Sequence, residues 1–139
     1  MAFVFRRGVF DSRHTKRLKG EYKVTETLKE NYEFRRAYTR GKCYSSPALV
    51  TYVFMHRKSH GASRIGITTG KKLGNAVARS RARRVIRAAW RELFPQVADG
   101  ADIVFVARMR TPASKSTDIM RTMRSHLISA GLIKGDGEQ

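Results

Sequence analysis

Hydrophobic residues change their spacing along the chain, and each change predicts a different element. From Thr27 to Tyr38 the apolar positions recur at mostly helical intervals, and Gly41 marks the end of that helix. Residues 48–56, ALVTYVFMH, are rich in β-branched and aromatic side chains, which is typical of a strand. Residues 64–69, RIGITT, place both isoleucines on one face of a second strand.

The second half of the chain is predicted to hold two helices around one buried strand. A helical pattern over 76–94 ends at Pro95, which cannot continue a helix. Residues 102–107, DIVFVA, are nearly all apolar, as expected for a central strand that is buried on both faces. Residues 116–130 show a second apolar stripe at helical spacing, with Gly131 beyond its end.

With a short edge strand at 42–46, these elements predict the order α-β-β-β-α-β-α. We expect a small single-domain α+β fold, a two-layer sandwich of three helices on a four-stranded sheet. The domain is predicted over 24–134, after a flexible basic N-terminal extension over 1–23 and before a flexible tail over 135–139. A chain of 139 residues suits one domain with one core.

Positive charge is concentrated in the middle of the chain. The formal net charge is +18, and between Phe34 and Arg91 there are fifteen Lys and Arg and no Asp or Glu. These like charges repel one another on one small fold, and a polyanion such as nucleic acid would relieve that repulsion. No apolar run approaches the roughly 18–20 residues of a membrane span, and the apolar N-terminus is too short for a signal peptide. We therefore expect a cytoplasmic protein that binds nucleic acid.

The predicted helix over 76–94 has six arginines on its polar side and no acid before Glu92. A solvated helix normally interleaves acids at i±4, and cations near a helix N-terminus oppose the helix dipole. Arginine also binds phosphate through a planar fork that lysine lacks. In the preceding loop Asn75 can cap the helix, so that free N–H groups face the same anions. The pattern favours phosphate binding over a solvated face, while Trp90 on the apolar side is predicted to lie in the core.

The sequence lacks a set of residues with the chemistry of a protein active site. The four histidines are scattered, and the one cysteine, Cys43, excludes an internal disulfide. The acid-free central block has no carboxylates for acid–base or metal chemistry, and Ser80 has no neighbouring base. We predict no catalytic residue, no metal ligand and no small-molecule substrate.

One block of the chain resembles a known family. The stretch 64–87, RIGITTGKKLGNAVARSRARRVIR, is similar to the strand–KKxGNAVxRNRxKR–helix signature of the protein component of bacterial ribonuclease P. The resemblance extends over about 24–130, through NYEFRRAY at 31–38 and DIVFVAR at 102–108. Ser80 departs from the pattern, which normally has Asn there, and this puts one RNA contact in doubt.

The resemblance implies a function in tRNA maturation. The family's RNA subunit performs a magnesium-dependent hydrolysis that removes the 5′ leader of precursor tRNA, and the Mg²⁺ would be held mainly by that RNA. The partners would be the catalytic RNA and precursor tRNA, with no membrane. The resemblance also implies a left-handed crossover between parallel strands around the arginine helix, contrary to the general handedness rule.

Two groups of residues are expected to contact RNA if the family roles carry over. Those facing the catalytic RNA would be Lys71, Lys72, Asn75, Arg79, Arg81, Arg83, Arg84 and Arg87. Those lining a cleft for the leader would be Phe34, Tyr38, Tyr52 and Arg64. Aromatic rings stack on unpaired bases with little sequence preference. Core packing is the alternative for each ring; the resemblance favours stacking for Phe34 and Tyr52 and leaves Tyr38 open.

Two other functions are compatible with parts of the pattern. A ribosomal or other structural RNA-binding protein would have the same composition and would differ only in lacking the signature block. A peripheral membrane protein could use the basic helix, whose Trp, Leu and Phe face is typical of interfacial helices. The flanking strands need that apolar face to close the core, which disfavours the membrane alternative.

Overall fold

A computed structural model describes residues 15–18, 21–24, 26–56 and 63–134. The predicted terminal segments 1–14 and 135–139 lie outside these residues. The helices and strands, in chain order, are β1 (Thr15–Leu18), β2 (Glu21–Val24), β3 (Glu26–Thr27), α1 (Asn31–Arg40), β4 (Lys42–Ser46), β5 (Leu49–Met55), β6 (Arg64–Thr68), α2 (Ala76–Leu93), β7 (Ala101–Ala107) and α3 (Ser116–Ser129). Three single 3₁₀ turns join them, namely η2 (Lys71–Leu73), η3 (Phe94–Gln96) and η4 (Thr111–Ala113).

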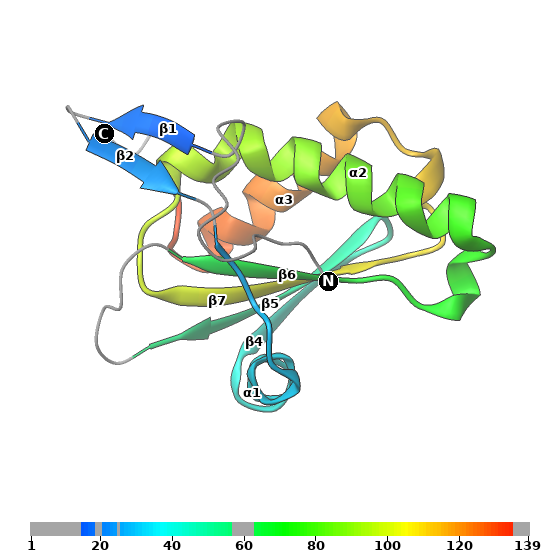
Figure 1. Cartoon of the computed structure of the whole chain (residues 1–139), viewed down its shortest axis with the longest axis horizontal. Helices are drawn as coiled ribbons and strands as arrows, with labels where there is room; N and C mark the ends of the chain where they lie inside the picture. Colours follow the sequence, from blue (N-terminus) through cyan, green and yellow to red (C-terminus); the bar gives the residue numbers. More distant parts are fainter. Residues whose placement is uncertain (1–14, 19–20, 25, 57–62, 135–139) are drawn as a thin grey trace.

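The main sheet is mixed and has the strand order β3-β6-β7-β5-β4 (Figure 1). The central strand β7 runs parallel to β6 and antiparallel to β5, and β4 pairs with β5 at one edge. All but one residue of β7 are buried, as the apolar run at 102–107 predicted. The four main strands are confirmed, and β3 adds a two-residue strand that was not predicted.

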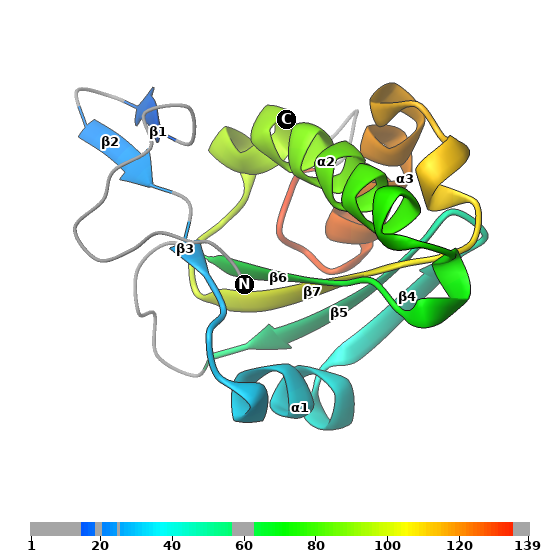
Figure 2. The same cartoon turned by 45° about the vertical axis from the view of Figure 1, so that its right-hand side comes forward.

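The helices cover both faces of the sheet (Figure 2). Helices α2 and α3 pack together on one face, over the larger core cluster, which includes Trp90 and Phe105. Helix α1 lies against β4, β5 and β7 on the other face, over a small cluster around Ala37 and Val104. The α+β class and three helices are confirmed, but the layering differs from the predicted two-layer sandwich. Because β7 is apolar on both faces, each face needs a helix to exclude water.

Helix α1 begins later than the apolar spacing predicts. Thr27 belongs to β3, and the helix starts at Asn31. The Glu33 carboxylate folds back and accepts hydrogen bonds from the backbone N–H groups of Lys29 and Glu30, both at 3.1 Å. This reciprocal contact satisfies donors that a helix start leaves open. At the other end, Gly41 stops the helix as predicted, with its N–H donating to the Ala37 carbonyl at 3.0 Å.

The segment predicted to be an irregular extension contains a β-hairpin. Strands β1 and β2 pair antiparallel as a separate two-stranded sheet, with Thr15 opposite Val24 and Leu18 opposite Glu21 (Figure 1). Two residues separate the strands, which is the commonest hairpin spacing. The basic residues Lys16 and Arg17 interrupt the apolar alternation, so the sequence pattern did not reveal these strands.

A buried histidine joins α3 to the sheet. His126 Nδ1 lies 2.8 Å from the Thr51 hydroxyl, and Nε2 lies 2.8 Å from the Ser46 hydroxyl. Burial lowers the pKa of His126. The neutral ring is therefore the form that the fold accommodates, with one nitrogen donating and the other accepting.

Acidification below about pH 6.5 is expected to destabilise the fold through His126. The unfolded chain takes up a proton there near the ordinary histidine pKa, while the folded chain does not, so stability falls as the pH falls. The slope can reach about 1.4 kcal/mol per pH unit. Urea unfolding between pH 7.5 and 5 measures it. The His126→Gln variant should lack this slope, and an unchanged slope in the variant would contradict the assignment.

Candidate nucleic-acid interface

Helix α2 separates a buried stripe from an arginine-rich surface. Ala82, Ile86, Ala89, Trp90 and Leu93 are buried, and the predicted core position of Trp90 is confirmed. The six arginines lie on the remaining surface of the same helix. This division follows from the 3.6-residue period, because the stripe that packs on β7 and α3 leaves the other side to solvent. We call this side of α2 the arginine face.

The start of α2 is built as predicted. The Asn75 side chain accepts a hydrogen bond from the Ala78 N–H at 3.0 Å and caps the helix. Arg79 donates to the Gly74 carbonyl at 2.8 Å, and Gly74 has a positive φ of 118° that favours glycine. Lys71 and Lys72 are exposed in the turn η2 just before this cap. The cap thus holds basic residues of the loop and of the helix at one end of α2.

Neutral oxygen atoms hold several of the arginines of this face. Arg81 donates to the Pro112 carbonyl at 2.6 Å, and Arg83 donates to the Thr69 hydroxyl at 2.8 Å. Arg84 is exposed. Within the described residues no ion pair joins Arg79, Arg81, Arg83 or Arg84 to a carboxylate. These contacts orient the guanidinium groups and leave their positive charge uncancelled, which suits a surface that binds phosphate.

Arg87 lies deeper, where the charges of the arginine face crowd together. Burial lowers the pKa of its guanidinium, and repulsion from Arg83 and Arg91 lowers it further. An anion next to these three side chains would offset the repulsion. The electrostatics of the folded chain therefore favour the same ligand as the sequence pattern.

Three aromatic side chains meet under α1, as the sequence predicted. The rings of Tyr38 and Tyr52 are in edge-to-face contact at 4.9 Å, and the Tyr38 hydroxyl lies 2.8 Å from that of Thr68. Phe34 rests directly on Gly66, where an added Cβ would overlap its ring. Tyr38 is 38% exposed, while Tyr52 and Phe34 are half-buried. Burial, and then the neighbouring Cys43 thiol, raises the pKa of Tyr52. The rings are thus partly open to a ligand.

Arg64 has a structural environment that sequence reasoning missed. Its guanidinium contacts the Glu33 carboxylate at 2.7 Å and the buried Asp102 carboxylate at 3.0 Å. Asp102 also contacts Arg36 at 3.0 Å and His56 at 3.1 Å. Burial alone would raise the pKa of Asp102, but the hydrogen bonds from Arg64 and His56 outweigh burial and lower it. This cluster ties α1 to β6 and β7, and the leader contact assigned to Arg64 stays a prediction.

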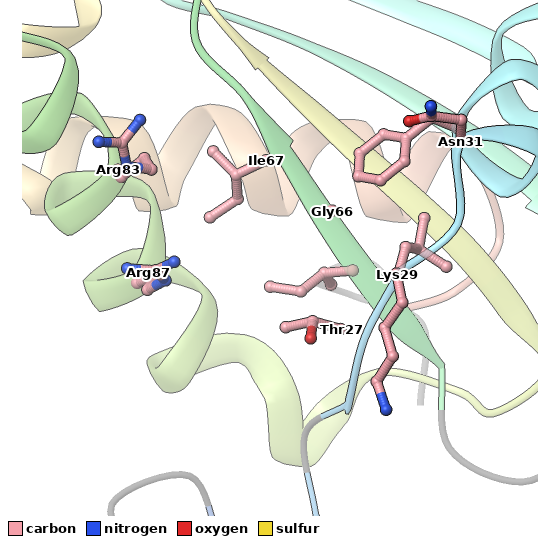
Figure 3. Close-up of a pocket in the computed structure, with 10 residues that line it drawn as sticks. Thr27, Lys29, Asn31, Gly66, Ile67, Arg83 and Arg87 are labelled. Carbon is pink, nitrogen blue, oxygen red and sulfur yellow. The ribbon is translucent and has the colours of Figure 1, made fainter. Parts of the chain in front are cut away.

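A pocket of about 720 Å³ opens beside the edge of β6. We call it the β6-edge pocket. Figure 3 shows Arg83 and Arg87 entering it from α2, with Asn31 and Lys29 on the opposite side. Phe34 and Ile67 also line it. The pocket thus brings residues from both predicted groups, catalytic RNA and leader, into one space. Sequence reasoning did not identify Asn31 or Lys29, because neither belongs to a charge run or an aromatic pattern.

The described residues do not offer a site that fits a magnesium ion. No three His, Cys, Asp or Glu side chains gather there. The carboxylates of Glu33 and Asp102 are already engaged by arginine. We therefore derive no step in which this part of the chain holds Mg²⁺.

A family model described as Ribonuclease P matches residues 22–131. The chain belongs to the ribonuclease P protein family. The ribonuclease P protein component of Clostridium novyi is 40% identical over 110 residues, which cover 79% of this chain and 97% of the relative. That of Clostridium kluyveri is 37% identical over 109 residues, with 77% and 96% covered.

Solved structures of ribonuclease P proteins share the fold. The protein from Staphylococcus aureus superposes with a TM-score of 0.64 at 25% identity, covering 78% of this chain and 97% of its own. The protein from Thermotoga maritima superposes with a TM-score of 0.65 at 22% identity, covering 79% and 99%. The chain is thus a protein subunit of a ribonuclease P ribonucleoprotein, with ribonuclease P RNA as its partner and tRNA processing as its pathway.

Membership of this family answers one of the two alternative functions. A ribosomal protein would not match the ribonuclease P family model over most of its length. As to the membrane alternative, no helix among the described residues combines the length and the apolar character that crossing a bilayer requires.

Proposed function

We propose that this chain binds ribonuclease P RNA through the arginine face of α2 and holds the 5′ leader of precursor tRNA against the rings under α1. It thereby assists the endonucleolytic removal of the leader. The catalytic RNA would perform the hydrolysis and hold most of the Mg²⁺ that the reaction needs. The protein would contribute positive charge and position, and no catalytic side chain.

The observation that carries this proposal is the unbalanced charge of the arginine face. Arg79, Arg81 and Arg83 donate to neutral oxygens and keep their full charge at the surface. Two RNA molecules repel each other through their phosphates, and such a surface between them lowers that repulsion. The six arginines, with Lys71 and Lys72, form the cationic part of the interface.

The second support is the aromatic group formed by Phe34, Tyr38 and Tyr52. Precursor leaders differ in sequence, so a protein that grips them needs contacts that every base can make. Stacking meets this requirement because each base has a π-face. The Phe34 ring can approach the sheet closely because Gly66 beneath it has no side chain.

Replacing Tyr52 with Ala is expected to weaken the binding of precursor tRNA about tenfold, which corresponds to the loss of one stacked base. Binding of mature tRNA should stay the same, because mature tRNA has no leader. The measurement is the affinity of the reconstituted holoenzyme for both tRNAs. Tyr32→Ala is the matched control, since Tyr32 is 58% exposed on the other flank of α1. Equal losses for both tRNAs would return Tyr52 to a packing role.

A further inference from the structure

The β6-edge pocket exists because β3 is only two residues long. Those residues pair with Arg64 and Ile65, and the Leu28 N–H then donates to the Ile65 carbonyl at 2.7 Å. After Leu28 the chain leaves the sheet and enters α1. In the described part of the chain nothing pairs with β6 beyond this point on that side. The edge of β6 at Ile67 therefore borders an open space.

The two walls of the pocket differ in chemistry (Figure 3). Arg83 and Arg87 form a cationic wall on α2, and the Thr69 hydroxyl orients Arg83 at 2.8 Å. The facing wall has the Phe34 ring, the Asn31 amide and the Lys29 ammonium group. A ligand that spans the pocket would meet charge at one end, and at the other an apolar ring beside an amide that can both donate and accept.

A single unpaired nucleotide matches this division. Its phosphate pairs with guanidinium groups, its base stacks on an aromatic ring, and the edge of the base forms hydrogen bonds with an amide. The pocket volume of about 720 Å³ lies within the roughly 300–1,000 Å³ of small-ligand sites. An acidic peptide added as a strand is a poorer match, because the open edge of β6 extends only from Gly66 to Thr68.

We propose that the β6-edge pocket binds one flipped-out RNA nucleotide, with its phosphate between Arg83 and Arg87 and its base on Phe34 beside Asn31. This inference rests on the proposed function, because it requires RNA on both α1 and α2. The repulsion among Arg83, Arg87 and Arg91, which lowers the pKa of Arg87, adds to the attraction for a phosphate. The nucleotide comes either from the leader of precursor tRNA or from an unpaired position of ribonuclease P RNA.

The test compares pocket variants in the reconstituted holoenzyme. Asn31→Ala and Lys29→Gln change exposed side chains outside the core, so both should fold, and thermal unfolding verifies this for them and for Arg87→Gln. Arg121→Gln is the matched control, because it removes an exposed arginine on α3. Two affinities are measured for each protein: that for ribonuclease P RNA alone, and the ratio between precursor and mature tRNA.

The source of the nucleotide decides which affinity changes. If it belongs to the leader, Asn31→Ala and Arg87→Gln should each lower the precursor-to-mature ratio about tenfold. One abasic leader position should then weaken wild-type binding and have a smaller effect on the Asn31→Ala protein. If the nucleotide belongs to ribonuclease P RNA, the same variants should weaken RNA binding about tenfold and leave the ratio unchanged.

Two results would overturn the pocket assignment. One is that Asn31→Ala and Lys29→Gln change neither affinity by more than about twofold while Arg87→Gln weakens RNA binding, since that pattern indicates a general charge contact. The other is that abasic leader positions affect Tyr52 variants and wild type differently but do not distinguish the Asn31→Ala protein. Both would leave the proposed function standing, because that function fails only if Tyr52→Ala and the arginine-face variants have no effect.

Discussion

The complex of this chain with ribonuclease P RNA is expected to weaken about a thousandfold when the salt concentration rises from 50 to 200 mM. Each cation that neutralises a phosphate releases a condensed counterion, so affinity falls steeply with salt when six or more such contacts form. The arginine face and the turn η2 supply eight cations at one end and along one side of α2. The reason is electrostatic and does not depend on the RNA sequence.

Fluorescence titration of labelled ribonuclease P RNA at several salt concentrations measures this slope. Replacing Arg79, Arg81 and Arg84 with Gln, one at a time, should reduce the slope by about one contact each. Arg121→Gln is the control, because Arg121 is on α3 and already has an acid partner in Asp118. A slope that corresponds to fewer than about two phosphate contacts would exclude the arginine face as the main RNA interface.

Replacing Asp102 with Asn is expected to destabilise the fold by about 3 kcal/mol or more. Asp102 is 1% exposed and contacts Arg36, His56 and Arg64. Removing its charge leaves two guanidinium groups close together beneath α1 with only Glu33 to balance them. Breaking a buried ion pair from one side costs roughly 3–5 kcal/mol, a large part of the roughly 5–15 kcal/mol that stabilises a typical domain.

Urea unfolding of Asp102→Asn at neutral pH measures the loss, and Asp118→Asn is the matched control. The Asp118 carboxylate pairs with Arg121 at 3.2 Å, and both side chains are mostly exposed. Solvent screens such a pair, so the control should lose less than about 1 kcal/mol. Similar losses in the two variants would mean that the cluster around Asp102 does not hold α1 on the sheet. Precursor binding should fall with Asp102→Asn as well, because Phe34 and Tyr38 are carried by α1.

Local patterns predicted the elements that have a strong period. The stripe of Ala82, Ile86 and Trp90 identified the buried side of α2, and its complement identified the arginine face. The apolar run at 102–107 identified the central strand. These predictions depend only on spacing and side-chain type, which the sequence states directly.

Contacts between residues far apart in the chain were outside the reach of those patterns. Asp102 stands out in its strand as a lone acid, but its partners Arg36 and Arg64 come from α1 and β6. The shift of the α1 start follows from Glu33, whose role as a cap and as a partner of Arg64 depends on how the chain returns to β6. No period in the sequence encodes such pairings.

The sequence by itself determined the class of ligand, because an acid-free run of arginines on one side of a helix binds phosphate in almost any fold that exposes it. Only the tertiary structure decided which of these arginines share a space with the aromatic rings. The β6-edge pocket brings Phe34 of α1 together with Arg83 and Arg87 of α2, across the short strand β3. Charge acts through its amount and local spacing, whereas a pocket requires side chains from separate elements to be held at fixed distances by packing.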